Sequence, residues 1–207
     1  MMRLLLPGII AMAVIVTASN ILVQYPLGLY LTWGALTYPF AFLVTDLANR
    51  LAGPAVARRV VLAGFVTGVV CSFIGTQITG EFGPLVTLRI AIGSGLAFLT
   101  AQLLDVTIFD RLRQGSWWKA PLVSTLVGSS VDTALFFTIA FSGTLTFIEP
   151  ANDVSWAADP MPLIGLGPVA PFWVSLALGD WIVKLLLALV ALVPFRVAVA
   201  RLTAKVA

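Results

Sequence analysis

The chain has 207 residues, of which 60% are hydrophobic and only 10% are charged, and its net charge is +3. Soluble domains carry about 25% charged residues, so this composition excludes a soluble fold and predicts an all-α integral membrane protein. A single cysteine excludes an intrachain disulfide, and the lack of histidine removes the commonest transition-metal ligand and proton shuttle. We therefore expect no metal, no cofactor and no nucleic acid partner.

Apolar runs long enough to cross a bilayer recur along the whole chain, and turn-forming residues separate them. We predict a bundle of six transmembrane helices in a single transmembrane domain that covers residues 1–207. The predicted spans are residues 4–24, 29–47, 60–79, 85–109, 119–141 and 169–193. The first span is expected to remain uncleaved, because its apolar stretch is too long for a signal peptide and no small-residue cleavage site follows it.

The distribution of basic residues predicts the orientation of the bundle. With six spans, every Lys and Arg except Arg89 and Lys184 falls on one side of the membrane. Because cytoplasmic loops are enriched in Lys and Arg, we expect both termini in the cytoplasm. Five or seven spans would scatter these charges, which favours six. The loops of the opposite side hold no Lys or Arg, and their charged residues are Glu81, Glu149, Asp153 and Asp159.

Four predicted helices carry polar residues at a period of about 3.6 residues, which places each set on one helix face. Lipid would exclude such faces, so they predict an internal cavity that the faces line. The hydroxyl residues taken alone are more typical of hydrogen bonds between packed helices. The sets are Thr17, Asn20 and Gln24, then Gln102 and Asp105, then Thr125, Ser129 and Asp132, and finally Asp180 and Lys184.

Charged residues inside the spans are the strongest indication of function. An ionised group at the centre of a spanning helix costs roughly 2.5–3.5 kcal/mol on an insertion scale, so it must be paired, shielded from lipid or used. Asp132 lies near the middle of its span, which favours a functional role. Asp180 and Lys184 lie four residues apart and can pair within one helix. That pair is equally compatible with a structural role and with a switch.

Two further charged positions have structural interpretations. Arg89 lies near the outer end of the fourth span, where it could snorkel toward the interface or pair with Glu81. Asp46 and Arg50 lie four residues apart at the cytoplasmic end of the second span, and we expect them to form a pair at the helix end.

Three blocks of sequence and a short motif in the last span occur in a fixed order. They are LTYPFAFLVTDL at residues 36–47, AFLTAQLLDV at 97–106 followed by FDRL at 109–112, STLVGSSVDTALFF at 124–137, and Gly179-Asp180 with Lys184. Together these blocks resemble the queuosine precursor transporter family, also known as vitamin uptake transporters. The resemblance implies a multi-pass protein of the bacterial inner membrane that imports 7-cyano-7-deazaguanine or a related 7-deazaguanine for tRNA modification.

A 7-deazaguanine presents N–H donors at N1 and N2, a carbonyl acceptor at position 6 and a flat aromatic face. A carboxylate can accept from both donors, an amide can serve the carbonyl, and an aromatic ring can stack on the base. We therefore expect substrate contacts from Asp132, Gln102, Asn20, Ser129, Trp173, Tyr38 and Asp105. The expected gating or coupling residues are Asp180, Lys184 and Arg89.

Two other classes of function stay open at this stage. The chain could be a membrane subunit that binds a purine- or vitamin-like solute and is energised by a separate ATPase, since it contains no Walker A motif. An integral membrane enzyme is disfavoured, because the sequence offers no nucleophile motif and no clustered metal carboxylates. We expect no catalytic residues, and the expected partners are the substrate and the lipid bilayer. A homo-oligomer is left open.

Overall fold

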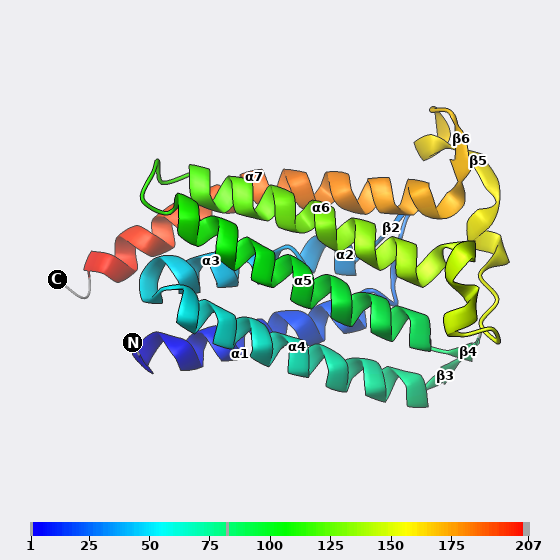
Figure 1. Ribbon diagram of the computed structural model, residues 1–207, viewed down its shortest axis with the longest axis horizontal. Helices are drawn as coiled ribbons and strands as arrows, with labels where there is room; N and C mark the ends of the chain where they lie inside the picture. Colours follow the sequence, from blue (N-terminus) through cyan, green and yellow to red (C-terminus); the bar gives the residue numbers. More distant parts are fainter. Residues whose placement is uncertain (1, 82, 205–207) are drawn as a thin grey trace.

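The computed structural model describes residues 2–81 and 83–204. Its long helices lie side by side and form an elongated bundle (Figure 1). Within the described residues, five helices are long and apolar enough to cross a membrane. The chain is therefore an all-α membrane protein. The five helices are α1 (Met2–Leu22), α4 (Pro54–Gln77), α5 (Leu88–Leu112), α6 (Lys119–Phe141) and α7 (Phe172–Ala204).

The helix faces that point away from the bundle are apolar. α1 exposes Leu6, Ile10 and Val14 at helical spacing, and α4 exposes Val66 and Phe73. Soluble monomers rarely expose continuous apolar surface on this scale, whereas lipid accepts it. The outer surface of the bundle thus fits a hydrocarbon environment, and polar side chains concentrate inside it.

The prediction of one continuous helix over residues 29–47 is wrong. This part of the chain forms an antiparallel hairpin of β1 (Pro26–Leu27) and β2 (Leu31–Thr32), then the short helix α2 (Gly34–Thr37) and the helix α3 (Phe40–Ala52). Proline has no N–H group and breaks the helical hydrogen-bond ladder, and Pro39 lies between α2 and α3. α3 has 13 residues and is therefore about 20 Å long, shorter than a bilayer core of about 30 Å.

The other five predicted spans correspond to α1, α4, α5, α6 and α7, with ends that differ by a few residues except in α7. That helix continues to Ala204, well beyond the predicted end at residue 193. β2, α2 and α3 follow one another along the bundle, back toward the end where the chain begins (Figure 1). The second leg of the chain is therefore an interrupted segment and not a sixth long helix.

α3 occupies the centre of the bundle and contacts each of the five long helices. It ends at Gly53, whose φ of 88° suits glycine, and Pro54 begins α4 directly afterwards. The main apolar core joins α1, α3, α4 and α5 around Met12, Phe98 and Val106. A second, smaller core packs Phe109 against Phe195 with ring centroids 6.1 Å apart. The polar faces of α5, α6 and α7 are consequently directed at α3 and at one another.

The two ends of the bundle differ in charge and in structure. Both termini lie at one end (Figure 1). The opposite end carries the hairpin of β3 (Thr79–Gly80) and β4 (Gly83–Pro84), the hairpin of β5 (Pro160–Pro162) and β6 (Val169–Pro171), and three 3-10 turns, Gly143–Ile148, Ser155–Ala158 and Leu163–Gly165. The basic residues predicted for one side gather at the end with the termini, although Lys205 lies outside the described residues. They are Arg3, Arg50, Arg58, Arg59, Arg111, Arg113, Lys119, Arg196 and Arg201, which lie within or beside the parts of α1, α3, α4, α5, α6 and α7 at that end.

A labelling experiment tests this arrangement. Glu81 and Gln114 lie beyond opposite ends of α5, whose 25 residues span about 37 Å. In a Cys71→Ala background, we expect Glu81→Cys to react with an impermeant thiol reagent on intact cells. Gln114→Cys should react only after the cells are permeabilised. Labelling of both positions from outside would contradict a bundle whose two ends face opposite sides of the membrane.

Candidate functional site

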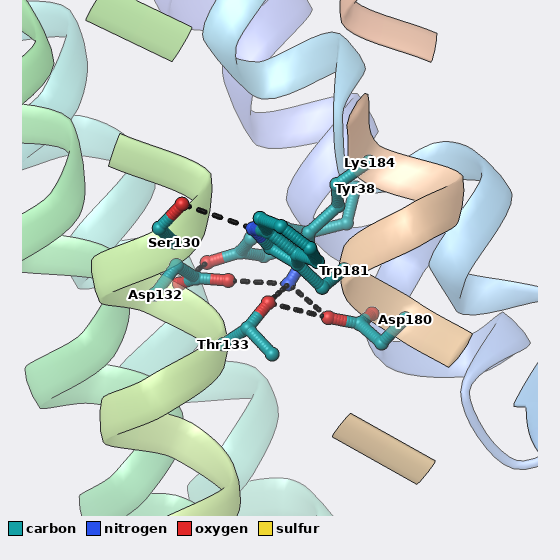
Figure 2. Close-up of polar contacts among 7 residues, drawn as sticks. All are labelled: Tyr38, Ser130, Asp132, Thr133, Asp180, Trp181 and Lys184. Carbon is teal, nitrogen blue, oxygen red and sulfur yellow. Dashed lines mark hydrogen bonds and ion pairs between the residues drawn. The ribbon is translucent and has the colours of Figure 1, made fainter. Parts of the chain in front are cut away.

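The ammonium group of Lys184 on α7 is held by three side chains (Figure 2). Its Nζ lies 2.6 Å from Asp132 Oδ2 on α6 and 2.5 Å from Asp180 Oδ2 on its own helix. It also donates to Thr133 Oγ1 at 3.1 Å, and Thr133 donates in turn to Asp180 Oδ2 at 2.8 Å. An ammonium group has three protons, so every one of them has a partner. We call Asp132, Thr133, Asp180 and Lys184 the ion cluster.

Two aromatic residues border the ion cluster. The ring of Tyr38 lies with its centroid 5.5 Å from Lys184 Nζ, and its hydroxyl approaches Asp132 Oδ1 at 3.5 Å. Trp181 donates from Nε1 to Ser130 Oγ at 2.9 Å and so ties α7 to α6 a second time. Both aromatic residues are drawn beside the charged groups in Figure 2.

The charges of the ion cluster do not balance. The side chains of Lys184 and Asp132 are each only 5% exposed, and the cluster opposes one cation to two carboxylates. Removing such groups from water is costly unless they are paired and hydrogen-bonded. Among the residues that the structure describes, Asp132 Oδ1 has only the long contact to Tyr38, which leaves it able to accept from a better-placed donor. The predicted contact of Asp180 with Lys184 is present, and Asp132 joins it.

A second group of buried polar side chains lies where α3, α5 and α6 meet. Thr45 Oγ1 contacts Gln102 Oε1 at 2.6 Å, and Asn49 donates to the carbonyl of Val106 at 2.9 Å. Asp46 accepts from hydroxyl groups of α6 at 3.4 Å. We call this group the inner polar cluster. Its members are Thr45, Asp46, Asn49, Gln102, Asp105, Ser124, Thr125 and Ser129.

The predicted pair of Asp46 with Arg50 is not formed. Arg50 instead donates to the carbonyl of Arg113 at 2.5 Å, while Asp46 is buried and turned toward Ser124 and Thr125 of α6. The prediction was wrong because it considered contacts within one helix only. The crossing of α3 over α6 offers Asp46 two hydroxyl donors that its own helix lacks.

A small cleft of about 40 Å³ lies between α1, α4 and α5. Asn20 lines it on α1 and also donates from Nδ2 to the carbonyl of Val16 at 2.9 Å. Phe65, Phe98 and Tyr38 contribute aromatic walls, and the Tyr38 and Phe98 rings meet edge to face with centroids 6.0 Å apart. Because Tyr38 contacts both the cleft and Asp132, it connects this space to the ion cluster.

Arg89 and Trp173 lie outside these groups. Arg89 is buried and donates to the carbonyls of Ile139 and Ser142, at 3.0 and 2.7 Å, at the C-terminal end of α6. Its backbone N–H contacts Glu149 at 3.0 Å, so Glu149 and not the expected Glu81 is its acidic neighbour. A cation suits the negative end of a helix dipole, which gives Arg89 a structural role there. Trp173 lies in the first turn of α7, about 16 Å along the helix from Lys184.

The structure divides the predicted substrate residues among three places. Asp132 and Tyr38 meet at the ion cluster, and Asn20 and Tyr38 line the cleft. The other buried residues belong to the inner polar cluster, namely Gln102, Asp105 and Ser129. Sequence reasoning missed Ser130, Thr133 and Trp181. Their positions close to Asp132 and Asp180 in the sequence could have marked them as candidates. Their hydrogen-bond partners, however, are visible only from the packing of α6 against α7.

Comparison with known proteins agrees with these observations. The chain matches the family model described as "Putative vitamin uptake transporter" over residues 32–199. The queuosine precursor transporter of Escherichia coli K12 is 36% identical over 194 residues, which cover 87% of this chain and 79% of that protein. The "Probable queuosine precursor transporter" of Haemophilus influenzae is 33% identical over 206 residues, with the same coverage of both chains.

A protein of Bacillus subtilis with the same name as the H. influenzae relative is 33% identical over 145 residues, which cover 60% of this chain and 61% of that protein. No solved structure matches the chain. The family match covers most of the chain and includes the ion cluster and the inner polar cluster. The resemblance inferred from the sequence blocks is confirmed. The chain therefore belongs to the vitamin uptake transporter family, as a multi-pass transporter of the bacterial inner membrane and not an enzyme.

Proposed function

We propose that this protein imports 7-cyano-7-deazaguanine, or a closely related 7-deazaguanine, for tRNA modification. The names of the E. coli, H. influenzae and B. subtilis relatives support a queuosine precursor as the solute. We further propose a single transmembrane domain with six crossings, of which the segment β2–α2–α3 is the second, and with both termini in the cytoplasm. The basic residues that lie toward the end with the termini, such as Arg50 in the last turn of α3, Arg111 in that of α5 and Arg201 in that of α7, support that orientation.

The observation that carries the proposal is the double position of Tyr38. One side of this residue lines the cleft, and its hydroxyl approaches Asp132. The cleft encloses about 40 Å³, less than the roughly 300–1,000 Å³ of small-molecule sites, so the helices that line it must move apart to admit a base. A flat base that stacks on its aromatic walls would lie next to an acceptor that already has a weakly held oxygen.

The chemistry of a 7-deazaguanine matches the groups at this boundary. Its N1 and N2 donors would replace the long contact of the Tyr38 hydroxyl on Asp132 Oδ1. Its position-6 carbonyl can accept from the second proton of the Asn20 amide. Lys184 orients the Asp132 carboxyl through the 2.6 Å contact, which preorganises the acceptor. In this arrangement the substrate does not contact Gln102, Asp105, Ser129 or Trp173.

Replacement of the acceptor tests this assignment. We expect Asp132→Asn to weaken binding of 7-cyano-7-deazaguanine by about 2–5 kcal/mol, the usual cost of losing one partner of a buried charge-assisted contact. Isothermal titration of the purified variant measures the loss. For an analogue without the exocyclic amine, the difference in affinity between the variant and the wild type should be smaller. Wild-type affinity of a folded Asp132→Asn protein would rule out direct contact.

Tyr38→Phe is the matched control for the same titration. It keeps the aromatic wall and removes only the hydroxyl that the substrate is proposed to displace. We therefore expect binding within about tenfold of the wild type, since a hydrogen bond as long as 3.5 Å is weak. A loss as large as that of Asp132→Asn would place the recognition at Tyr38 instead.

A second experiment separates a structural role of the ion cluster from a role in transport. Lys184→Met alone leaves two buried carboxylates without their cation and should cost about 3–5 kcal/mol of stability. The triple variant Asp132→Asn, Asp180→Asn and Lys184→Met removes all charges together. We expect it to regain thermal stability in detergent yet to remain inactive in transport.

The readout is the queuosine content of tRNA in cells that cannot make the precursor themselves. Membrane levels of each variant are measured alongside, so that a loss of protein is not mistaken for a loss of transport. Wild-type queuosine content with the triple variant would show that the ion cluster serves only to hold α6 and α7 together.

A further inference from the structure

Two buried aspartates meet where α3 packs against α5. Asp46 is 3% exposed and Asp105 is 0% exposed. Thr45 and Asn49 of α3 each contact the residue 57 positions later on α5, so the two helices keep a constant register. Asp46 lies between these contacts on α3, and Asp105 lies between them on α5. Their carboxyl groups are close enough to interact.

The pair lacks a hydrogen-bond donor. Neither carboxyl oxygen of Asp105 receives a hydrogen bond from a donor among residues 2–81 and 83–204. The hydroxyl of Ser124 borders both carboxyl groups, but its contact within hydrogen-bond distance is to Asp46 Oδ1, at 3.4 Å. Thr125 also donates to Asp46, at 3.4 Å. Two carboxylates can only accept, whereas a proton on either group makes that group a donor to the other.

Basic side chains do not neutralise the pair in the described part of the chain. The ion pairs there join Arg113 to Asp110, and Lys184 to Asp132 and Asp180. Arg50 of α3 donates to a backbone carbonyl, and Arg89 is held at the far end of α5. The other titratable groups on the packed helices are exposed or contact other residues. They are the exposed Arg58, Arg59, Arg111, Lys119, Arg196 and Arg201, then Tyr38, which faces Asp132, and Cys71, which faces Thr17.

These surroundings favour a proton as the missing partner. Two carboxylates that share a buried site do not both ionise readily, because like charges at contact distance repel each other strongly. A metal ion would need further oxygen ligands around it, and no third Asp, Glu, His or Cys joins the pair within the described residues. A shared proton requires only the two carboxyl groups that are present.

The pair joins the same two segments that close the cleft. Tyr38 directly precedes the leg that forms α3, and its ring meets that of Phe98 on α5 edge to face, with centroids 6.0 Å apart. Phe98 and Asp105 lie seven residues apart, about two turns of α5. A base that passes from the cleft to Asp132 would have to part Tyr38 from Phe98. That movement would draw α3 away from α5 and so separate Asp46 from Asp105.

We propose that Asp46 and Asp105 share one proton that links α3 to α5 while the cleft is closed, and that admission of a base separates the two carboxyl groups and releases this proton to water. The shared proton rests on the buried pair alone, whereas its release rests on the proposed function. Thr45 and Asn49 also link α3 to α5, but hydroxyl and amide groups do not ionise near neutral pH. The carboxyl pair is therefore the link through which pH acts on the opening of the cleft.

Infrared spectroscopy of the purified protein tests the shared proton without substrate. The carbonyl stretch of a protonated carboxylic acid is separate from the bands of carboxylates and peptide groups. We expect the wild type to show this band at neutral pH, with a shift in D₂O, and Asp46→Asn and Asp105→Asn each to lack it. Asparagine has the size of a protonated aspartic acid and also carries a donor, so both variants should fold.

The matched control for the infrared test is Asp110→Asn. Asp110 lies on the same helix as Asp105, but its side chain is 41% exposed and pairs with Arg113, so the variant should keep the band. Absence of the band in the wild type would overturn the shared proton. Loss of the band in Asp132→Asn but not in Asp105→Asn would also overturn it, because the proton would then belong to the ion cluster.

Calorimetric titration of 7-cyano-7-deazaguanine in buffers with different ionisation enthalpies counts the protons released on binding. We expect the wild type to release up to one proton per base and Asp105→Asn to release none from this site. Because linkage is reciprocal, the wild-type Kd should fall by up to about tenfold for each unit of rising pH on the acid side of neutral. The Kd of Asp105→Asn should change much less.

The outcomes of this titration separate the two parts of the proposal from the proposed function. Binding by the wild type without proton release would overturn the release step, while the infrared band would still decide the shared proton. Equal pH dependence in the wild type and Asp105→Asn would likewise contradict release from this pair. No binding at any pH would instead overturn the proposed function, and with it the release that rests on it.

Discussion

The contact of Lys184 with Asp132 and Asp180 is the interaction on which the polar interior depends. It fixes α7 against α6 deep in the bundle, and it is the reason that two carboxylates can remain buried there. Two apolar residues would pack the same interface at lower cost. The retention of the charges therefore suggests a role beyond packing. We propose that this role is substrate binding through the free acceptor on Asp132.

The interrupted second leg gives the interior its shape. The chain enters this leg through the hairpin of β1 and β2, and Pro39 then separates α2 from α3. Tyr38 keeps helical φ and ψ at this junction, where it lines the cleft and contacts Asp132. Interrupted helices with binding groups at the break are a recurrent feature of transporters, because irregular backbone at membrane depth is tolerated where protein buries it. The proposed substrate position follows from this break.

Much of the helical framework could be predicted from hydropathy and charge. Five spans agree with α1, α4, α5, α6 and α7, because each is long, apolar and bounded by turn residues. The second span was mispredicted, since hydropathy reports burial in lipid and registers neither the turn at Gly28, which begins a hairpin, nor the missing N–H of Pro39. The polar periodicity correctly placed Thr125, Ser129 and Asp132 on a buried face.

Contacts between helices could not be predicted in the same way. The sequence suggested a pair of Asp46 with Arg50 and a pair of Asp180 with Lys184, because both have helical spacing. Only the second exists, and its most important partner, Asp132, comes from another helix. The separation of Gln102, Asp105 and Ser129 from the ion cluster likewise depends on how α3 packs between α5 and α6. A single sequence contains no record of that packing.

Transport by the isolated chain tests the central claim most directly. Purified protein is reconstituted into liposomes loaded with unlabelled 7-cyano-7-deazaguanine, and entry of the labelled compound by exchange is followed. The account predicts rapid exchange that excess external substrate suppresses and that protein-free liposomes lack, with no ATPase present. Failure to exchange by a protein that still binds the compound would contradict it and indicate a subunit that needs a separate energising partner.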